Sequence, residues 1–132
     1  MRLCVDTSAY SHFKRGDQAA VEAFAGAREL GLPAIVLGEL RAGFGVGRRR
    51  QRNEDELREL LTHPLVRVLE VDAHAAEHYA EIYVQLRRAG TPVPTNDLWI
   101  AALAAREGMP VLTYDARFER IARIGTRVLR TR

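Results

Sequence analysis

Four carboxylates stand where short apolar stretches of the sequence end or where helices begin: Asp6, Glu39, Asp97 and Asp115. If they were gathered in one place they would repel one another, and without a cation some would have to stay protonated. A Mg²⁺ or Mn²⁺ ion removes this conflict, because both ions prefer oxygen ligands and still accept phosphate oxygens. Such a site polarises a phosphodiester and lowers the pKa of a water molecule, which is the chemistry of a metal-dependent nuclease.

The elements that must position these acids alternate between strands and helices. Apolar runs predict strands at residues 3–5, 33–37, 65–71, 111–113 and 127–129. Helical spacing and capping residues predict helices after Thr7, from Asp17 to Gly31, from Leu37 to the glycines at 43, 45 and 47, after Asn53, after Asp72, from Thr95 or Asn96 to Glu107, and at 116–121. This alternation predicts a single α/β domain over residues 1–132, with a central parallel sheet of four or five strands.

In such a sheet the acids should meet at one edge. Right-handed connections place the carboxyl ends of all strands along the same edge, where open α/β sheets bind ligands. Asp6, Glu39 and Asp115 each lie just past a predicted strand. Asp97 begins a helix that follows another helix, so handedness does not place it, but residues 90–96 could span about 20 Å if extended. Each acid taken alone could equally be a helix cap or a first-turn residue.

The composition allows this interpretation and limits others. The chain carries 20 Lys and Arg against 17 Asp and Glu, so a body surrounding an acidic pocket would be basic and would suit a polyanionic substrate. An Arg-rich solvated surface would give the same numbers. The one cysteine, Cys4, excludes an internal disulfide and should be an inert buried thiol. We expect no signal peptide, no transmembrane segment and a cytoplasmic location.

Four segments of the chain resemble the PIN-domain ribonucleases, in particular the VapC-type toxins of bacterial toxin–antitoxin pairs. These segments are Asp6-Thr7-Ser8, Val36-Leu37-Gly38-Glu39-Leu40, Thr95-Asn96-Asp97 and Thr113-Tyr114-Asp115-Ala116-Arg117-Phe118. The resemblance implies a three-layer α/β/α fold. It also implies that Asp6, Glu39 and Asp97 are the core metal-binding and catalytic acids and that Asp115 is a fourth, more variable one. Ser8 and Asn96 fall where the family often has a supporting polar residue.

The same resemblance implies an activity and a set of partners. The expected enzyme is an endoribonuclease that uses Mg²⁺ or Mn²⁺ to hydrolyse single-stranded or loop segments of RNA, such as transfer or ribosomal RNA, leaving a 5′-phosphate. We expect a homodimer that a cognate antitoxin protein inhibits and that contacts DNA only through this antitoxin. Arg48, Arg49, Arg50 and Arg52 are candidate RNA-binding residues, because guanidinium groups bind phosphates, although such runs are also found on solvated surfaces.

Three rival interpretations remain open at the level of sequence. The chain could be a catalytically inactive PIN-like module that works only in a DNA-binding complex with an antitoxin, its acids serving as helix caps. His74, Glu77 and His78 match the H-x-x-E-H pattern of inverted zinc peptidases, although a third acidic ligand would be needed. A nuclease could also act on DNA. The Gly43–Gly47 segment lacks the Lys and Ser or Thr of a P-loop, which argues against nucleotide binding.

Overall fold

The computed structural model describes residues 1–131 and places five strands in one sheet. The strands are β1 (Arg2–Val5), β2 (Glu29–Pro33), β3 (Val66–Leu69), β4 (Val111–Thr113) and β5 (Thr126–Val128), in the spatial order β3-β2-β1-β4-β5. Each neighbouring pair runs parallel. The carboxyl ends of these strands therefore lie along one edge, which is the edge where the sequence places the acids.

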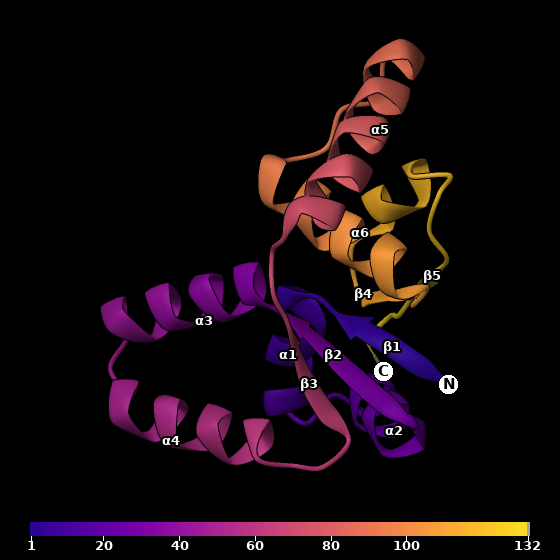
Figure 1. Cartoon of the computed structure of the whole chain (residues 1–132). Coiled ribbons are helices and arrows are strands. Elements are labelled where there is room, and N and C mark those ends of the chain that lie inside the picture. Colours follow the sequence, from indigo (N-terminus) through magenta and orange to yellow (C-terminus); the bar gives the residue numbers. More distant parts are fainter. Residues whose placement is uncertain (132) are drawn as a thin grey trace.

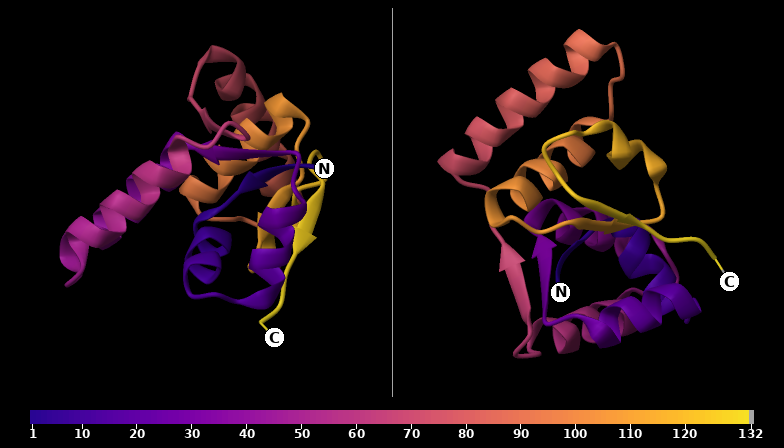
Figure 2. Two further views of the ribbon diagram at one scale, coloured as in Figure 1. Left: turned by 90° about the horizontal axis from the view of Figure 1, so that it is seen from below. Right: turned by 90° about the vertical axis from the view of Figure 1, so that its right-hand side faces the viewer.

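Helices cover both faces of this sheet. Within the described residues they are α1 (Thr7–Lys14), α2 (Gln18–Gly26), α3 (Ala34–Val46), α4 (Arg50–Leu61), α5 (Ala73–Ala89), α6 (Thr95–Glu107) and the 3₁₀ helix η1 (Ala116–Arg120). Figures 1 and 2 show α5 and α6 on one side of the sheet and α1 and α2 on the other, so the sheet is the middle of three layers. The predicted α/β/α fold with a central parallel sheet is confirmed.

The centre of the core is formed by β1 and α6. Leu3, Cys4 and Val5 are fully buried, as is the run of α6 from Ile100 to Ala104. Burial on every side explains why these segments are apolar throughout rather than alternating with polar residues. Burial also raises the pKa of the Cys4 thiol, so that it stays neutral, and the prediction of a buried thiol is confirmed.

The second strand lies earlier in the chain than the sequence predicts. The prediction of a strand at residues 33–37 is wrong, because β2 covers Glu29–Pro33 and the following residues form α3. Pro33 has no N–H for a sheet, and its fixed φ suits the entry to a helix, so the strand ends there. A short apolar run does not by itself distinguish a strand from a buried helix. In the structure the run supplies the buried face of α3, namely Val36, Leu37 and Leu40.

Two helix ends differ from prediction for related reasons. α2 ends at Gly26 rather than at Gly31, because Gly31 belongs to β2. α3 does not stop at Gly43 but continues to Val46, since the glycines in its last turns are exposed and leave the packed face of the helix intact. Glu39 consequently lies in the second turn of α3 rather than in the first.

Helices α3 and α4 pack against each other and project from the body of the protein, as Figure 1 shows. We call this pair, residues 34–61, the arm. The predicted helix start after Asn53 is wrong, because α4 begins at Arg50. The four arginines of the candidate RNA-binding block are exposed at the tip of the arm, where α3 gives way to α4. The predicted helices that follow Asp72 and begin at Thr95 are confirmed.

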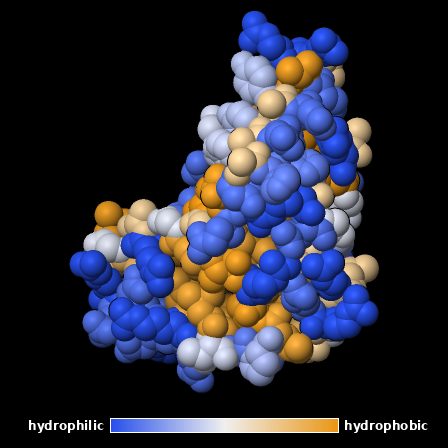
Figure 3. Space-filling view, viewed as in Figure 1, coloured by the Kyte–Doolittle hydropathy of each residue, from blue (hydrophilic) through white to orange (hydrophobic). Residues whose placement is uncertain are grey.

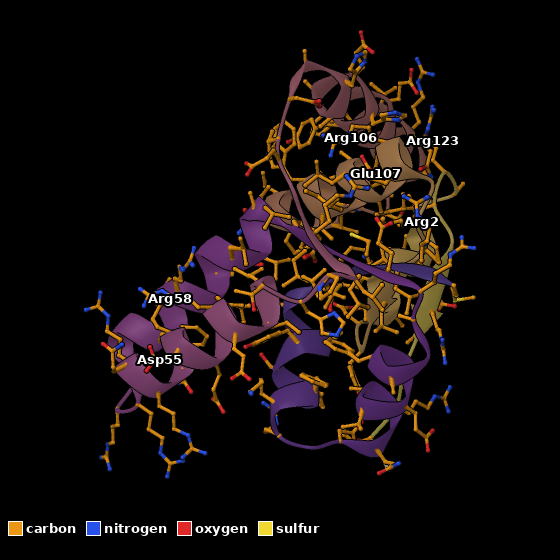
Figure 4. The ribbon with its side chains drawn as sticks, turned by 60° about the horizontal axis from the view of Figure 1, so that its bottom comes forward. Arg2, Asp55, Arg58, Arg106, Glu107 and Arg123 are labelled. Carbon is orange, nitrogen blue, oxygen red and sulfur yellow. The ribbon has the colours of Figure 1, made fainter. Side chains whose placement is uncertain are left out.

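The arginines at the opposite, amino-terminal edge of the sheet are already paired with acids. Arg2 lies 3.5 Å from Glu29, and Arg106 lies 2.9 Å from Glu107. Figure 4 shows Arg2, Arg106 and Glu107 gathered on this side, far from Asp55 and Arg58 on the arm. Among residues 1–131 the tip arginines Arg48–Arg50 and Arg52 form no such ion pair, so their charge is available to a partner.

On the face of the molecule shown in Figure 3, apolar side chains gather in a broad region. Figure 3 shows them between the arm and the column formed by α5, over the part of the molecule where β3 lies. Leu65 is 45% exposed, and Leu60, Val66 and Val68 are partly buried in the same region. Separately, no helix among residues 1–131 combines the length and apolar character needed to cross a bilayer.

Candidate active site

Hydrogen bonds hold Asp6 at the carboxyl end of β1. Asp6 caps α1 and is only 4% exposed. Its Oδ1 accepts the backbone N–H of Ala9 and the hydroxyl of Ser8, both at 2.8 Å, and its Oδ2 accepts the hydroxyl of Thr113. Burial raises the pKa of Asp6, and these hydrogen bonds oppose the rise. Ser8, predicted as a supporting residue, therefore contacts the first acid directly.

Thr113 links two of the predicted acids, and sequence reasoning missed it. It is the last residue of β4 and is fully buried. Its hydroxyl donates to Asp6 and accepts the backbone N–H of Asp115 at 2.9 Å. The hydroxyl of Ser8 accepts the backbone N–H of Tyr114 at 3.0 Å, which adds a second link between α1 and the end of β4. The sequence feature that could have identified Thr113 is a hydroxyl side chain at the end of a predicted strand, two residues before Asp115.

Glu39 reaches the same edge from α3. Its Oε1 accepts the hydroxyl of Thr7 at 2.6 Å, and its Oε2 accepts the side-chain N–H of Asn96 at 3.3 Å. Thr7 follows Asp6 in the chain and Asn96 precedes Asp97, so these two bonds hold Glu39 beside the segments that carry two of the other acids. Asn96, also predicted as a supporting residue, thus acts on Glu39. Nothing in the sequence, apart from a possible helix-capping role, predicted that Thr7 would contact Glu39.

Asp97 lies in the first turn of α6, as predicted. Burial raises the pKa of Asp97 to about 6, the charge of Arg117 opposes the rise, and the charges of Asp115, Asp6 and Glu39 add to it. These charge interactions mean that the segment before α6 does return Asp97 to the edge where the other acids lie. Within residues 1–131 the carboxylate of Asp97 accepts no hydrogen bond, so its oxygens are open to a ligand.

Asp115 is held by an arginine to which the sequence analysis gave no role. The Arg117 side chain donates to Oδ1 of Asp115 through Nε at 3.1 Å and to Oδ2 through Nη2 at 2.6 Å. The backbone N–H of Arg117 donates to Oδ1 at 2.9 Å. Hydrogen bonding by Arg117 holds the pKa of Asp115 below its ordinary value. The same Nη2 lies 4.0 Å from Oδ2 of Asp97, so the guanidinium stands between two of the acids.

The structure thus brings the four predicted acids to one edge from separate elements. Asp6 and Asp115 follow β1 and β4, while Glu39 and Asp97 come from α3 and α6. Within the described part of the chain, no group of three or more Asp, Glu, His or Cys side chains is arranged to hold a metal ion as it stands. The site is an open set of carboxylate oxygens. This donor set fits Mg²⁺ or Mn²⁺, which take oxygen ligands, and Mg²⁺ in particular keeps several waters when a protein binds it.

Two other predicted groups lie outside this site. Arg48, Arg49, Arg50 and Arg52 are at the tip of the arm and make none of the contacts described above. His74 and Glu77 are exposed on α5, with Nδ1 of His74 3.8 Å from Oε2 of Glu77. Among residues 1–131 no further ligand joins them and His78 to complete a metal site. The described residues therefore give the zinc peptidase interpretation no support.

Sequence comparison relates the chain to known ribonucleases. The family model of the PIN domain matches residues 3–124. Ribonuclease VapC5 of Mycobacterium tuberculosis is 36% identical over 84 residues, which cover 64% of this chain and 62% of VapC5. Ribonuclease VapC4 of the same organism is 37% identical over 90 residues, which cover 66% of this chain and 67% of VapC4. The chain thus spans somewhat less than two thirds of VapC5 and about two thirds of VapC4.

Structural comparison extends the likeness to nearly the whole chain. A chain in the crystal structure of DNA-bound VapBC from Salmonella typhimurium matches with a TM-score of 0.85 at 28% sequence identity. The match covers 97% of this chain and 98% of that chain. At this coverage the likeness includes the sheet, the arm and the elements that carry the four acids.

Proposed function

Because the chain belongs to the PIN-domain family and to its VapC group, we propose that it is a Mg²⁺- or Mn²⁺-dependent endoribonuclease and the toxin of a toxin–antitoxin pair. One observation carries the proposal: hydrogen bonds and an ion pair link the four acids at the carboxyl edge of the sheet, Asp6 to Asp115 through Thr113 and Asp115 to Asp97 through Arg117, while Glu39 bonds to the neighbours of Asp6 and Asp97. A divalent cation bound among neighbouring carboxylates offsets their mutual repulsion.

In this proposal each side chain has a defined task. Asp6, Glu39 and Asp97 hold the ion, and Asp115 completes or tunes the site. When bound, the ion polarises a phosphodiester of RNA and lowers the pKa of water. The reaction is hydrolysis, in which water adds to phosphorus and the bond to the 3′-oxygen breaks, leaving a 5′-phosphate and a 3′-hydroxyl. Ser8 and Asn96 keep Asp6 and Glu39 in position through the hydrogen bonds described above.

The test is cleavage of total cellular RNA by the purified protein with Mn²⁺, followed by sequencing of the new RNA ends. We expect Asp6→Asn and Asp97→Asn to abolish cleavage while circular dichroism shows an unchanged fold. Glu77→Gln, which removes an exposed carboxylate on α5, is the matched control and should cleave normally. If Asp6→Asn kept full Mn²⁺-dependent cleavage, the assignment would be wrong. Equal cleavage of single-stranded DNA would change the substrate class.

The RNA backbone is placed along the arm in this proposal. Arg48, Arg49, Arg50 and Arg52 are exposed at its tip, and a polar hollow of about 480 Å³ lies beside them, lined by Arg41, Arg50, Gln51, Glu54 and Arg58. Figure 4 shows that Arg58 and Asp55 lie well away from the paired arginines of the amino-terminal edge. Exposed guanidinium groups of this kind bind phosphates without reading sequence.

The remaining parts of the proposal concern partners. A cognate antitoxin would inhibit the enzyme and connect it to DNA. The similar VapBC of Salmonella typhimurium, which is bound to DNA in its crystal structure, supports this part of the proposal. The apolar region between the arm and α5 gives such a protein a surface to cover. We also propose a homodimer, supported by Tyr83 and Val84, which are 43% and 41% exposed on α5. Since RNA is the proposed substrate, the cytoplasm is the proposed location.

A further inference from the structure

The hydrogen-bond partners of the four acids divide them into two kinds. A carboxylate offers about four lone-pair positions. Both oxygens of Asp115 accept bonds from Arg117: Oδ1 from the backbone N–H, Oδ2 from Nη2, and the two oxygens together from the single N–H of Nε. Asp6 also accepts three donors, two on Oδ1 and one on Oδ2, but all three are uncharged. Glu39 accepts one uncharged donor on each oxygen, and Asp97 accepts no hydrogen bond among the described residues. Asp115 is therefore the acid whose two oxygens both face a cationic side chain, where a divalent ion would be repelled.

Arg117 has the complementary arrangement. Within residues 1–131 its side-chain hydrogen bonds all use Nε and Nη2, so Nη1 is left for another acceptor. The side chain is 47% exposed, which leaves it accessible from solvent. Nη2 lies 4.0 Å from Asp97, the acid most affected by the charges of the others. Arg117 thus presents a fixed, permanently charged donor at the border of the acidic site.

We propose that Arg117 binds a phosphate oxygen of the RNA beside the metal site and that Asp115 is a positioning residue for Arg117 rather than a metal ligand. The inference rests on the function proposed above. It assigns the metal to Asp6, Glu39 and Asp97 alone. It also predicts that one divalent ion binds per site, because a second ion on Asp115 would lie against the guanidinium and be repelled by it.

The chemistry of phosphodiester hydrolysis gives Arg117 a reason to be there. An edge lined with carboxylates repels a polyanion, and the reacting phosphate gains negative charge on its oxygens as water adds. A guanidinium provides charge-assisted hydrogen bonds to such oxygens and, since it does not lose its proton in proteins, it stabilises charge without exchanging a proton. The bonds that Arg117 donates to Asp115 fix the direction in which Nη1 points, so that this donor is already oriented when RNA arrives.

Metal binding separates this proposal from the alternative in which Asp115 is a ligand. Mn²⁺ alone is titrated into the wild type, Asp115→Asn and the double variant Asp115→Asn/Arg117→Gln, and the heat is measured by calorimetry. We expect one Mn²⁺ per chain in each case, and the double variant, whose net charge is unchanged, should match the wild-type affinity. A loss of about tenfold or more in the double variant, as is typical when a metal site is damaged, would overturn the proposal.

RNA binding without metal tests Arg117 itself. A labelled single-stranded RNA of random sequence is titrated in EDTA at several salt concentrations, so that the readout does not depend on cleavage. Arg117→Gln should reduce the slope of log affinity against log salt by about 0.7, the value for one lost phosphate contact on a single strand. The matched control is Arg123→Gln, which removes an arginine paired with Glu81, and it should leave the slope unchanged. An unchanged slope in Arg117→Gln would overturn the proposal.

Cleavage kinetics then test whether Asp115 acts through Arg117. Both single variants should lower kcat/KM, and the double variant should be no worse than Arg117→Gln, because two residues that act as one unit are not additive. Arg117→Lys should restore part of the rate by returning a positive charge. Additive losses would overturn the positioning role of Asp115. Failure of the proposed function is distinguishable, since a wild type that neither binds Mn²⁺ nor cleaves RNA would refute the nuclease whatever the result for Arg117.

Discussion

Thr113 and Asp6 lie 107 positions apart in the chain and share a hydrogen bond where β1 and β4 end side by side. The hydroxyl of Thr113 also accepts the backbone N–H of Asp115, so one buried group contacts two of the acids. The geometry of the site is therefore determined by the register of the central strands. A change at Thr113 should affect both the stability of the fold and the position of Asp6.

We predict that Thr113→Val, which keeps the shape of the side chain, destabilises the protein by about 1–3 kcal/mol because buried polar groups lose their partner. Urea unfolding without metal measures this change. Thr113→Ser is the control, because it retains the hydroxyl and should lie closer to the wild type in both stability and Mn²⁺ affinity. Wild-type stability in Thr113→Val would mean that the hydrogen bond to Asp6 does not stabilise the fold.

The raised pKa of Asp97 predicts a specific pH dependence. Between the ordinary pKa of an aspartate and about 6, the folded protein binds a proton at Asp97 that the unfolded chain does not bind. The contribution of Asp97 to the stability of the fold therefore falls as the pH rises through this window. Above the window, the full destabilisation caused by burying the charged Asp97 is present. Asp97→Asn should unfold at a higher temperature than the wild type at neutral pH without metal, and this difference should shrink as the pH is lowered toward about 4.

Thermal unfolding of the two proteins across this pH range is the measurement. Mn²⁺ should reverse their order at neutral pH, because the ion stabilises the wild type by binding the folded state and cannot do so equally in the variant. A difference between the two proteins that did not change with pH would show that Asp97 is not perturbed in the way described.

The arm arginines should contribute to RNA binding through charge alone. Arg49→Gln/Arg50→Gln should weaken binding of single-stranded RNA similarly for all sequences and lower the salt slope by about 1.4 if both arginines contact phosphates. Arg28→Gln/Arg88→Gln removes the same charge at exposed positions outside the arm and is the matched control. Equal losses in the two double variants would mean that only net charge matters and that the arm has no special role.

The exposed apolar residues of α5 predict the site of dimer contact. Tyr83→Glu should convert a dimer into a monomer in light-scattering measurements, because a charge would be buried at an apolar contact. His74→Glu places the same charge at another exposed position of α5 and should leave the mass unchanged. A wild type that is monomeric at every concentration would refute the homodimer.

The shared location of the acids was predictable from the sequence, because parallel strands bring their carboxyl ends together whatever the details of the loops. Asp6 and Asp115 follow strands whose apolar character is unambiguous. Glu39 was placed at the correct edge although its strand was assigned too late, since an error of a few residues in β2 does not move α3 to another edge. Asp97 needed the structure, because nothing local specifies where a segment between two helices leads.

Other contacts of the site depend on the direction in which a side chain points, and the periodicity of the sequence does not predict that direction. The sequence is equally compatible with an Arg117 side chain that points to solvent from η1, whereas in the structure it folds back onto Asp115. The hydroxyls of Thr7 and Thr113 look like ordinary helix-start and strand residues until their partners are known. The length of the arm was also not predicted, because Gly43 and Gly45 were expected to end the helix and instead lie in the exposed last turns of α3.

Binding of Mn²⁺ at neutral pH tests the central claim most directly, namely that carboxylates from separate elements share one divalent ion. Calorimetry should show saturable binding by the wild type and by the control Glu77→Gln. In Asp6→Asn and Asp97→Asn the affinity should fall by about tenfold or more, with the fold intact by circular dichroism. Equal Mn²⁺ affinity in all four proteins, or no binding by the wild type, would contradict the account.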